Sequence, residues 1–87
     1  MSIGDVKRQI LDLREDLSRF RAQVTINIGL DMPHFRNRHQ LVTMGSNSEL
    51  FDEAAAALLE AEEALSDLVN ALSTVIEKYD NWVNLRG

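Results

Sequence analysis

Residues 51–82, which read FDEAAAALLEAEEALSDLVNALSTVIEKYDNW, decide the fold of this chain. Apolar side chains recur in this stretch at spacings of three and four without interruption, the repeat of an α-helix that packs along other helices. The ten repeating positions are Phe51, Ala54, Leu58, Ala61, Leu65, Leu68, Leu72, Val75, Tyr79 and Trp82. The pattern predicts a long helix in an all-α, coiled-coil-like fold.

Capping signals set the expected helix boundaries. Ser46 and Glu49 match a capping box and Ser48 is a competing cap, which predicts a helix over residues 47–84. Ser2 precedes a similar apolar rhythm near the N-terminus, which predicts a helix over residues 3–27. Residues 28–46 contain Gly29, Pro33 and Gly45, so we expect a connector that is irregular or holds a short helix near residues 33–43.

The 87 residues are expected to form one helical-hairpin domain, an antiparallel pair of helices over residues 1–87. A chain this short buries a limited share of its surface, and it has no cysteine for disulfides. The second predicted helix is also longer than the first, so the first cannot cover it alone. We therefore expect the fold to be completed by oligomerisation, with a homodimer and a heteromeric helical partner both open.

The second helix is predicted to present its C-terminal half to that partner. Its apolar stripe is wider than a two-helix seam requires. We expect residues 51 to about 72 to pair within the chain and the remainder to stay exposed. The predicted partner interface comprises Leu65, Leu68, Val69, Leu72, Val75, Ile76, Tyr79, Trp82 and Val83.

Charge divides the chain into two unlike halves. Residues 1–44 hold seven basic and five acidic residues, whereas residues 45–87 hold two basic and nine acidic residues. The halves could therefore guide pairing, although a solvated acidic face explains many of the acids equally well. Lys7, Arg14 and Arg21 recur every seven residues and are expected to meet acids such as Glu62 on the facing helix. A net charge of -5 argues against nucleic acid as the partner.

Chemistry-bearing residues form no recognisable site. His34 and His39 lie five residues apart, without acids or cysteines at metal-ligand spacing, and the carboxylate clusters lack the histidine of a di-metal bundle. With Arg36 and Arg38 the two histidines make the connector basic, which suits either a solvated segment or contact with an acidic partner. No nucleophile, base and acid set or phosphate loop can be named, so we expect no enzyme activity, metal or cofactor.

The N-terminus shows no sign of a signal peptide. Residues 1–5 read MSIGD, and charges interrupt every long apolar run. We therefore expect a protein that is made in the cytoplasm, is soluble and does not insert into a membrane.

Residues 43–51, TMGSNSELF, followed by a long acidic and alanine-rich helix, resemble the second half of the WXG100 family of small type VII secretion proteins. The likeness covers residues 43–80. Thr43 stands at the family's tryptophan position, and Val83 stands where its C-terminal export signal, which would contain Tyr79, has an acid. The resemblance therefore implies the partner that does not carry the export signal, such as a small helical targeting factor that binds a larger secreted effector, with export without a cleaved signal peptide as an option beside the cytoplasm.

Non-catalytic protein binding is the function that the sequence favours. The resemblance narrows it to a WXG100-like secretion partner. The alternative is an intracellular helical adaptor, immunity protein or antitoxin that acts by sequestering its partner.

Overall fold

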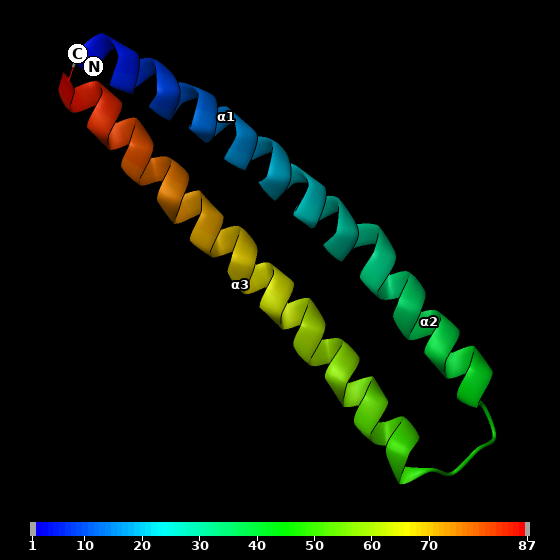
Figure 1. Cartoon of the computed structure of the whole chain (residues 1–87). Helices are drawn as coiled ribbons and strands as arrows, with labels where there is room; N and C mark the ends of the chain where they lie inside the picture. Colours follow the sequence, from blue (N-terminus) through cyan, green and yellow to red (C-terminus); the bar gives the residue numbers. More distant parts are fainter. Residues whose placement is uncertain (1, 87) are drawn as a thin grey trace.

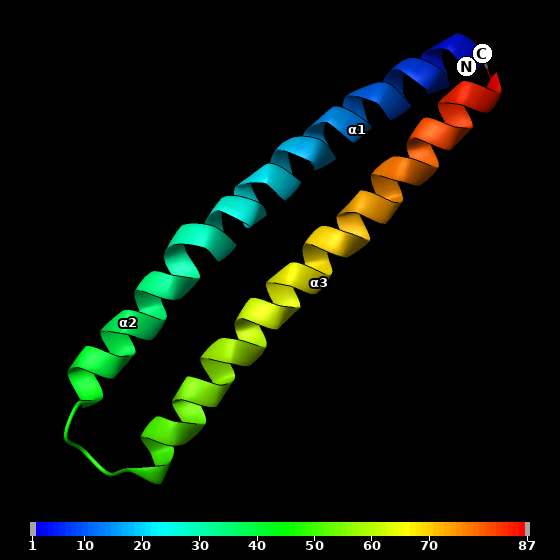
Figure 2. The ribbon, with the colours of Figure 1, turned by 180° about the vertical axis from the view of Figure 1, so that it is seen from behind.

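The computed structural model describes residues 2–86, and of Arg86 the backbone alone. Three helical segments, α1 (Ile3–Ile26), η1 (Asn27–Asp31) and α2 (Met32–Thr43), follow one another as a single rod, and α3 (Glu49–Arg86) returns beside them (Figure 1). Seen from behind, α3 again lies along α2 and then α1, and the start of α1 and the end of α3 lie at the same end of the hairpin (Figure 2). The predicted all-α antiparallel hairpin is confirmed, with extents of 64 × 18 × 17 Å.

The first helix starts as its capping signal predicts. Ser2 has an extended backbone, and its side-chain oxygen accepts a hydrogen bond from the Asp5 N–H at 3.2 Å. This bond satisfies one of the N–H groups that a helix start leaves without an intrahelical acceptor. α1 ends at Ile26, one residue before the predicted boundary.

The expectation of an irregular connector is wrong over most of its length. A π-helical turn, η1, links α1 to α2, and the Met32 N–H donates to the Asn27 carbonyl five residues back. Pro33, which has no N–H and whose ring crowds the carbonyl four residues earlier, follows directly after this wide turn. The π turn therefore carries the helix past the proline, and the predicted short helix is present as α2.

The reversal of the chain occupies only residues 44–48. Gly45 has φ of +81°, a left-handed conformation that glycine adopts without strain, and the Ser46 N–H donates to the Thr43 carbonyl at 3.0 Å. The Ser48 carbonyl accepts from the N–H groups of Phe51 and Asp52. α3 therefore begins at Glu49, two residues after the predicted start.

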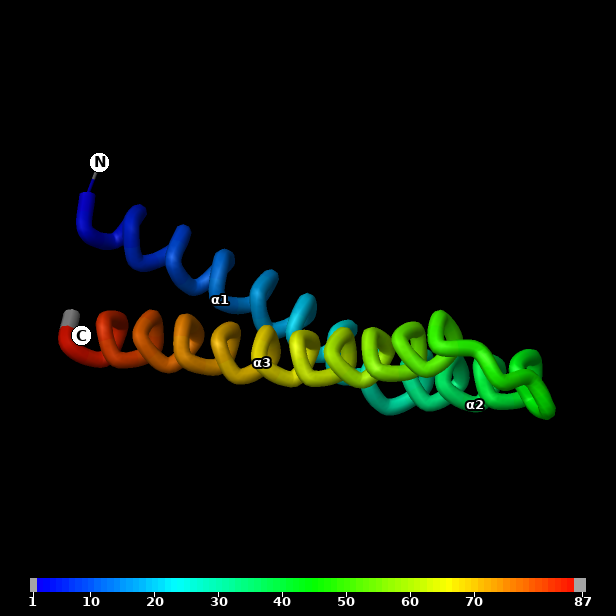
Figure 3. Tube along the Cα trace, turned by 90° about the horizontal axis from the view of Figure 1, so that it is seen from below, coloured from blue at the N-terminus to red at the C-terminus, as the bar shows by residue number. Residues whose placement is uncertain are grey.

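Because α1, η1 and α2 form one continuous rod, the two arms of the hairpin do not differ in length as the sequence predicted. Because α1, η1 and α2 together span residues 3–43, they accompany α3 from end to end. Figure 3 shows that the two rods cross: α1 lies on one side of α3 near the termini, and α2 lies on the other side near the turn. An unmatched C-terminal half of the long helix, as predicted from its length, does not exist in this hairpin.

Few side chains are buried between the two arms of the hairpin. Among the described residues only Val24, Met32, Leu72 and Ile76 are buried hydrophobic side chains. The inward row of α3 again alternates spacings of three and four, and all of its members are buried or half-buried: Ala55, Leu58, Glu62, Leu65, Val69, Leu72, Ile76, Tyr79 and Val83. This row shares only four positions with the seam predicted from the sequence.

The described part of the chain contains no helix with the length and apolar character needed to cross a membrane.

Candidate protein-binding interface

One long side of the hairpin is held together by polar side chains. Arg14 contacts both carboxylate oxygens of Asp80 through Nε and Nη2, the latter at 3.1 Å from Oδ2. Further along, Arg21 Nη1 donates to the Ser73 hydroxyl at 3.0 Å. We call this side, with the contact between Arg36 and Glu62 described next, the ion-pair face.

The third contact of the ion-pair face joins α2 to α3. Arg36 Nε lies 3.2 Å from Glu62 Oε2, and Nε makes no hydrogen bond, so the contact is a charge pair with imperfect alignment. The predicted basic flank thus meets an acid at Arg14 and a hydroxyl at Arg21. Glu62 pairs with a connector arginine rather than with α1.

The guanidinium of Arg14 lowers the pKa of Asp80. Its hydrogen bonds to the carboxylate are the main cause, burial of the group opposes them, and the Coulombic attraction adds to them. The same hydrogen bonds raise the pKa of Arg14. Asp80 is therefore held in its charged form by its partner on the other helix.

The opposite side of the hairpin carries apolar side chains. On α1 the inward positions are Ile10, Leu17 and Val24, and Arg14 and Arg21 lie on one flank of this row. Leu13 and Phe20, which stand one residue before the two arginines, therefore lie on the other flank. The same reasoning applies to α3, where Ser73 and Asp80 mark the ion-pair side. The opposite flanks therefore share one side of the hairpin, which we call the apolar face: Leu13, Phe20, Phe35, Val42, Ala54, Ala61, Leu68, Val75 and Trp82.

Seven of the nine residues of the apolar face are exposed, and Leu68 and Trp82 are half-buried. Phe20 is 50% exposed, Phe35 51% and Val75 37%, although each is large and hydrophobic. Ala57, Ala64 and Ala71 border the same face and are exposed as well. A lengthwise row of apolar side chains on one side of a hairpin is the kind of surface that another helix can cover.

The structure separates the nine predicted interface residues into two groups. Leu68, Val75 and Trp82 lie on the apolar face. The other six belong to the inward row, where the chain's own rod packs on them: Leu65, Val69, Leu72, Ile76, Tyr79 and Val83. The expectation that Leu72 and Ile76 stay exposed is wrong, because they are among the few buried residues of the hairpin.

Three large members of the apolar face were absent from the predicted interface: Leu13, Phe20 and Phe35. The signal for Leu13 and Phe20 is present in the sequence, since Lys7, Arg14 and Arg21 mark one flank of α1 and Leu13 and Phe20 stand one residue before the arginines. Phe35 could not be placed without the π turn, which resets the helical phase between α1 and α2.

The basic connector residues are spread around α2. His34 is exposed and its ring lies 5.9 Å from that of Phe35, whereas half-buried His39 lies edge-on to Phe51 at 6.4 Å. Arg38 is exposed. The residues of the predicted basic patch therefore do not lie together. His39 contacts Phe51 of α3, Arg36 pairs with Glu62, and His34 and Arg38 lie on the outer surface.

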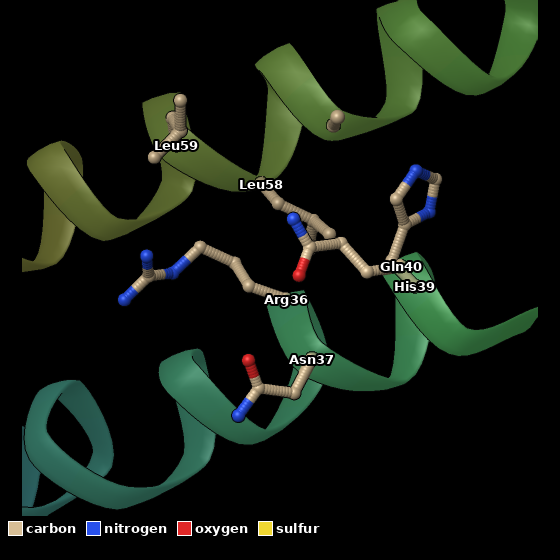
Figure 4. Close-up of a pocket in the computed structure, with 7 residues that line it drawn as sticks. Arg36, Asn37, His39, Gln40, Leu58 and Leu59 are labelled. Atoms are coloured by element: carbon tan, nitrogen blue, oxygen red, sulfur yellow. The ribbon is translucent and has the colours of Figure 1, made fainter. Parts of the chain in front are cut away.

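A hollow lies between α2 and α3 beside Arg36. Figure 4 shows Arg36, Asn37, His39 and Gln40 of α2 on one side and Leu58 and Leu59 of α3 on the other. Its volume is about 240 Å³, below the roughly 300–1,000 Å³ of pockets that enclose small ligands. In residues 2–86 no three His, Cys, Asp or Glu side chains come close enough together to hold a metal ion.

The surface area indicates how much of the hairpin is left uncovered. The chain exposes 6538 Å², against roughly 5,200 Å² for a compact monomer of its mass. Its radius of gyration is 19.3 Å, whereas a compact domain of this length would have about 12 Å. The elongated hairpin therefore leaves more of its surface accessible than a compact monomer of the same mass would.

Comparisons with protein families, with curated proteins and with solved structures give no match for this chain.

Proposed function

We propose that the chain is a non-catalytic protein-binding module whose apolar face binds a helical partner. The observation that supports this function is the row of half-exposed aromatic and aliphatic side chains on one side, opposite a side that the chain closes with its own polar contacts. An apolar stripe along a hairpin of 64 Å suits helices of comparable length, which bury such stripes when they form bundles.

Within this class we favour a WXG100-like secretion partner, a targeting factor for a type VII-type effector. The support is the resemblance of residues 43–80, together with a helical hairpin of 87 residues. Such a factor would hold a helical part of the effector on its apolar face, and the effector would carry the export signal that Val83 leaves incomplete.

Deletion of the gene, followed by measurement of the neighbouring genes' products inside and outside the cells, tests this function. A long helical effector should disappear from the medium and return with the wild-type gene. Phe20→Glu should fail to restore export because it places a charge on the apolar face. Leu59→Glu is the matched control, since Leu59 is 50% exposed but lines the ion-pair side beside Glu62.

Unchanged export of every neighbouring product after deletion would contradict the secretion function. Equal restoration by Phe20→Glu and wild type would contradict the assignment to the apolar face.

The acidic outer surface of α3 favours one alternative, an adaptor, immunity protein or antitoxin that sequesters a basic partner. Glu60, Glu63 and Asp67 are exposed there, and α3 holds nine acids against two bases. In this case deletion would harm the cells through an unmasked toxin instead of stopping export. The same deletion strain therefore distinguishes the two functions.

A further inference from the structure

We propose that the chain has a second binding surface, a groove between α2 and the first half of α3 that binds a short basic amphipathic helix of another protein. The groove lies on the ion-pair face, away from the apolar face, so the proposal goes beyond the proposed function and does not depend on it. We call this surface the acidic groove. It is lined by Asn37, Gln40, Leu59, Glu63, Ser66 and Asp67.

Three adjoining hollows form the acidic groove. The hollow of about 240 Å³ in Figure 4 shares Arg36 and Leu59 with a hollow of about 560 Å³ that continues along α3 to Asp67. On its other side it adjoins a hollow of about 590 Å³ on α2 that extends to Met44. Along α3 the groove runs from Ala55 to Asp67, roughly 18 Å at about 1.5 Å per residue. A helix of about 12 residues matches this length.

The polar contacts that close the ion-pair face stop before this groove. In the half of the face near the termini, arginines of α1 reach Ser73 and Asp80. Seven-residue steps back along α3 from Ser73 lead to Ser66 and Leu59, which no arginine covers in this way. Ser66 is exposed and Leu59 is 50% exposed. The two arms therefore leave room at this end of the face for side chains of another molecule.

The charge of the groove favours a basic occupant. Glu63 and Asp67 are exposed one helical turn apart, and within residues 2–86 neither carboxylate has an ion pair or hydrogen bond. Like charges at this spacing destabilise a helix, and a base between them would remove the repulsion. The chain does not supply that base, because Arg36 pairs with Glu62 and residues 45–77 contain no basic residue.

The apolar part of the groove requires the occupant to be amphipathic as well. Leu58 is half-buried and Leu59 is half-exposed in its floor, and Leu41 and Met44 are 64% and 73% exposed at the end near the turn. A purely basic segment would leave these side chains uncovered, and a purely apolar helix would leave the carboxylates unpaired. A helix that carries apolar residues and bases on one face satisfies both.

Model peptides test this proposal directly. The probe is a fluorescein-labelled helix of about 12 residues with leucines and lysines on one face, and fluorescence anisotropy measures its binding. Two matched peptides replace every lysine by glutamate or every leucine by serine. We expect the peptide of leucine and lysine to bind at least about tenfold more tightly than either matched peptide. Its affinity should fall as salt is added.

Variants of the chain locate the bound peptide. Glu63→Lys combined with Asp67→Lys should weaken binding at least about tenfold, because it replaces both unpaired acids by bases. Asp12→Lys combined with Glu77→Lys is the matched control, since it changes the net charge equally at exposed residues outside the groove. Phe20→Glu, on the apolar face, should change the affinity by less than about twofold. Circular dichroism of each variant verifies the helices.

Equal weakening by the two double variants would show that net charge alone attracts the peptide, and would overturn the groove as its site. Loss of binding with Phe20→Glu, but not with the double variant of Glu63 and Asp67, would place the peptide on the apolar face and overturn the proposal. Equal binding of all three peptides, or binding of none, would overturn it as well. Effector export depends on the apolar face and should persist when the groove is changed, so failure of this proposal and failure of the proposed function are distinguishable.

Discussion

The two long faces of the hairpin are built on the same spacing but are completed in different ways. On the ion-pair face, Arg14 and Arg21 are seven residues apart and contact Asp80 and Ser73. On the apolar face, Leu13 and Phe20 are also seven residues apart, and their exposed surface has no such cover. A step of one residue turns a side chain by about 100° around the helix. A shift of one residue therefore separates the ion-pair face, which the chain covers with its own side chains, from the apolar face, which another molecule can contact.

Side-chain reach explains why only one face closes. An arginine has a long stem that can cross the groove between two helices and place its charged end on the partner. Leucine, valine and alanine are too short to cover each other across the edge of a two-helix layer. A second layer of helices is therefore needed to bury them.

The largest difference in stability is expected between variants of Ile76 and Val75. The two residues are neighbours with similar side chains, so the comparison isolates the effect of the face on which each lies. Ile76 is 4% exposed and faces the rod, whereas Val75 is 37% exposed on the apolar face. Ile76→Asp should cost about 3–5 kcal/mol, enough to unfold a thin hairpin, because it buries a charge in place of packed methyl groups. Val75→Asp should retain its helicity at 222 nm. Equal loss of helicity in both variants would show that the two positions are not distinct.

The second prediction concerns the apolar face and its effect on stability. If this face binds another copy, the melting temperature should rise with protein concentration, because association stabilises the folded state. Phe20→Glu should remove that concentration dependence, since it puts a charge into the interface. Leu59→Glu should preserve it. Melting curves over a hundredfold range of concentration make the comparison, and a wild-type curve that does not move with concentration would contradict it.

The third prediction sharpens the role of the ion-pair face. Arg14 lowers the pKa of Asp80 in the folded chain, while an unfolded aspartate has a pKa of about 3.9. The pair therefore contributes stability that is present above the unfolded pKa and is lost as the pH falls through the lower, folded pKa. Acidification from pH 5 to pH 2 should lower the melting temperature of the wild type more than that of Asp80→Asn. Parallel pH profiles would show that the pair adds nothing.

The smallest effect is expected at Arg36 and Glu62. Arg36→Gln should change the free energy of unfolding by no more than about 1 kcal/mol, because the pair is partly exposed and poorly aligned. A double-mutant cycle with Glu62→Gln, measured by urea denaturation, isolates the pair itself. A coupling of several kcal/mol would mean that the ion-pair face contributes far more to stability than its geometry indicates.

The sequence was sufficient for the fold class but not for the phase of the long helix. Alternation of three and four identifies α3 and its partner rod. However, the apolar stripe of α3 is wide enough for two seams that differ by one residue. One seam runs through Ala54 and Ala61, and the other runs through Ala55 and Glu62. A single-sequence pattern favours the more apolar seam. The contact of Glu62 with Arg36 of α2 shows that the more polar seam faces inward.

The connector was misjudged for a related reason. Gly29 and Pro33 are residues that end helices in most contexts, and a π turn has no strong sequence signal. Here the four-residue steps from Val24 to Ile28 to Met32 keep apolar side chains toward α3 only if one turn is wider. Packing against α3, which the local sequence does not reveal, explains why the helix continues.

The mass of the chain in solution tests most directly whether the apolar face is the binding surface. Light scattering after size exclusion should give twice 9.8 kDa for the wild type and for Leu59→Glu, and 9.8 kDa for Leu68→Glu, with all three equally helical. A mass of 9.8 kDa for the wild type would contradict self-association, and a mass that falls with Leu59→Glu but not with Leu68→Glu would contradict the assignment of the apolar face.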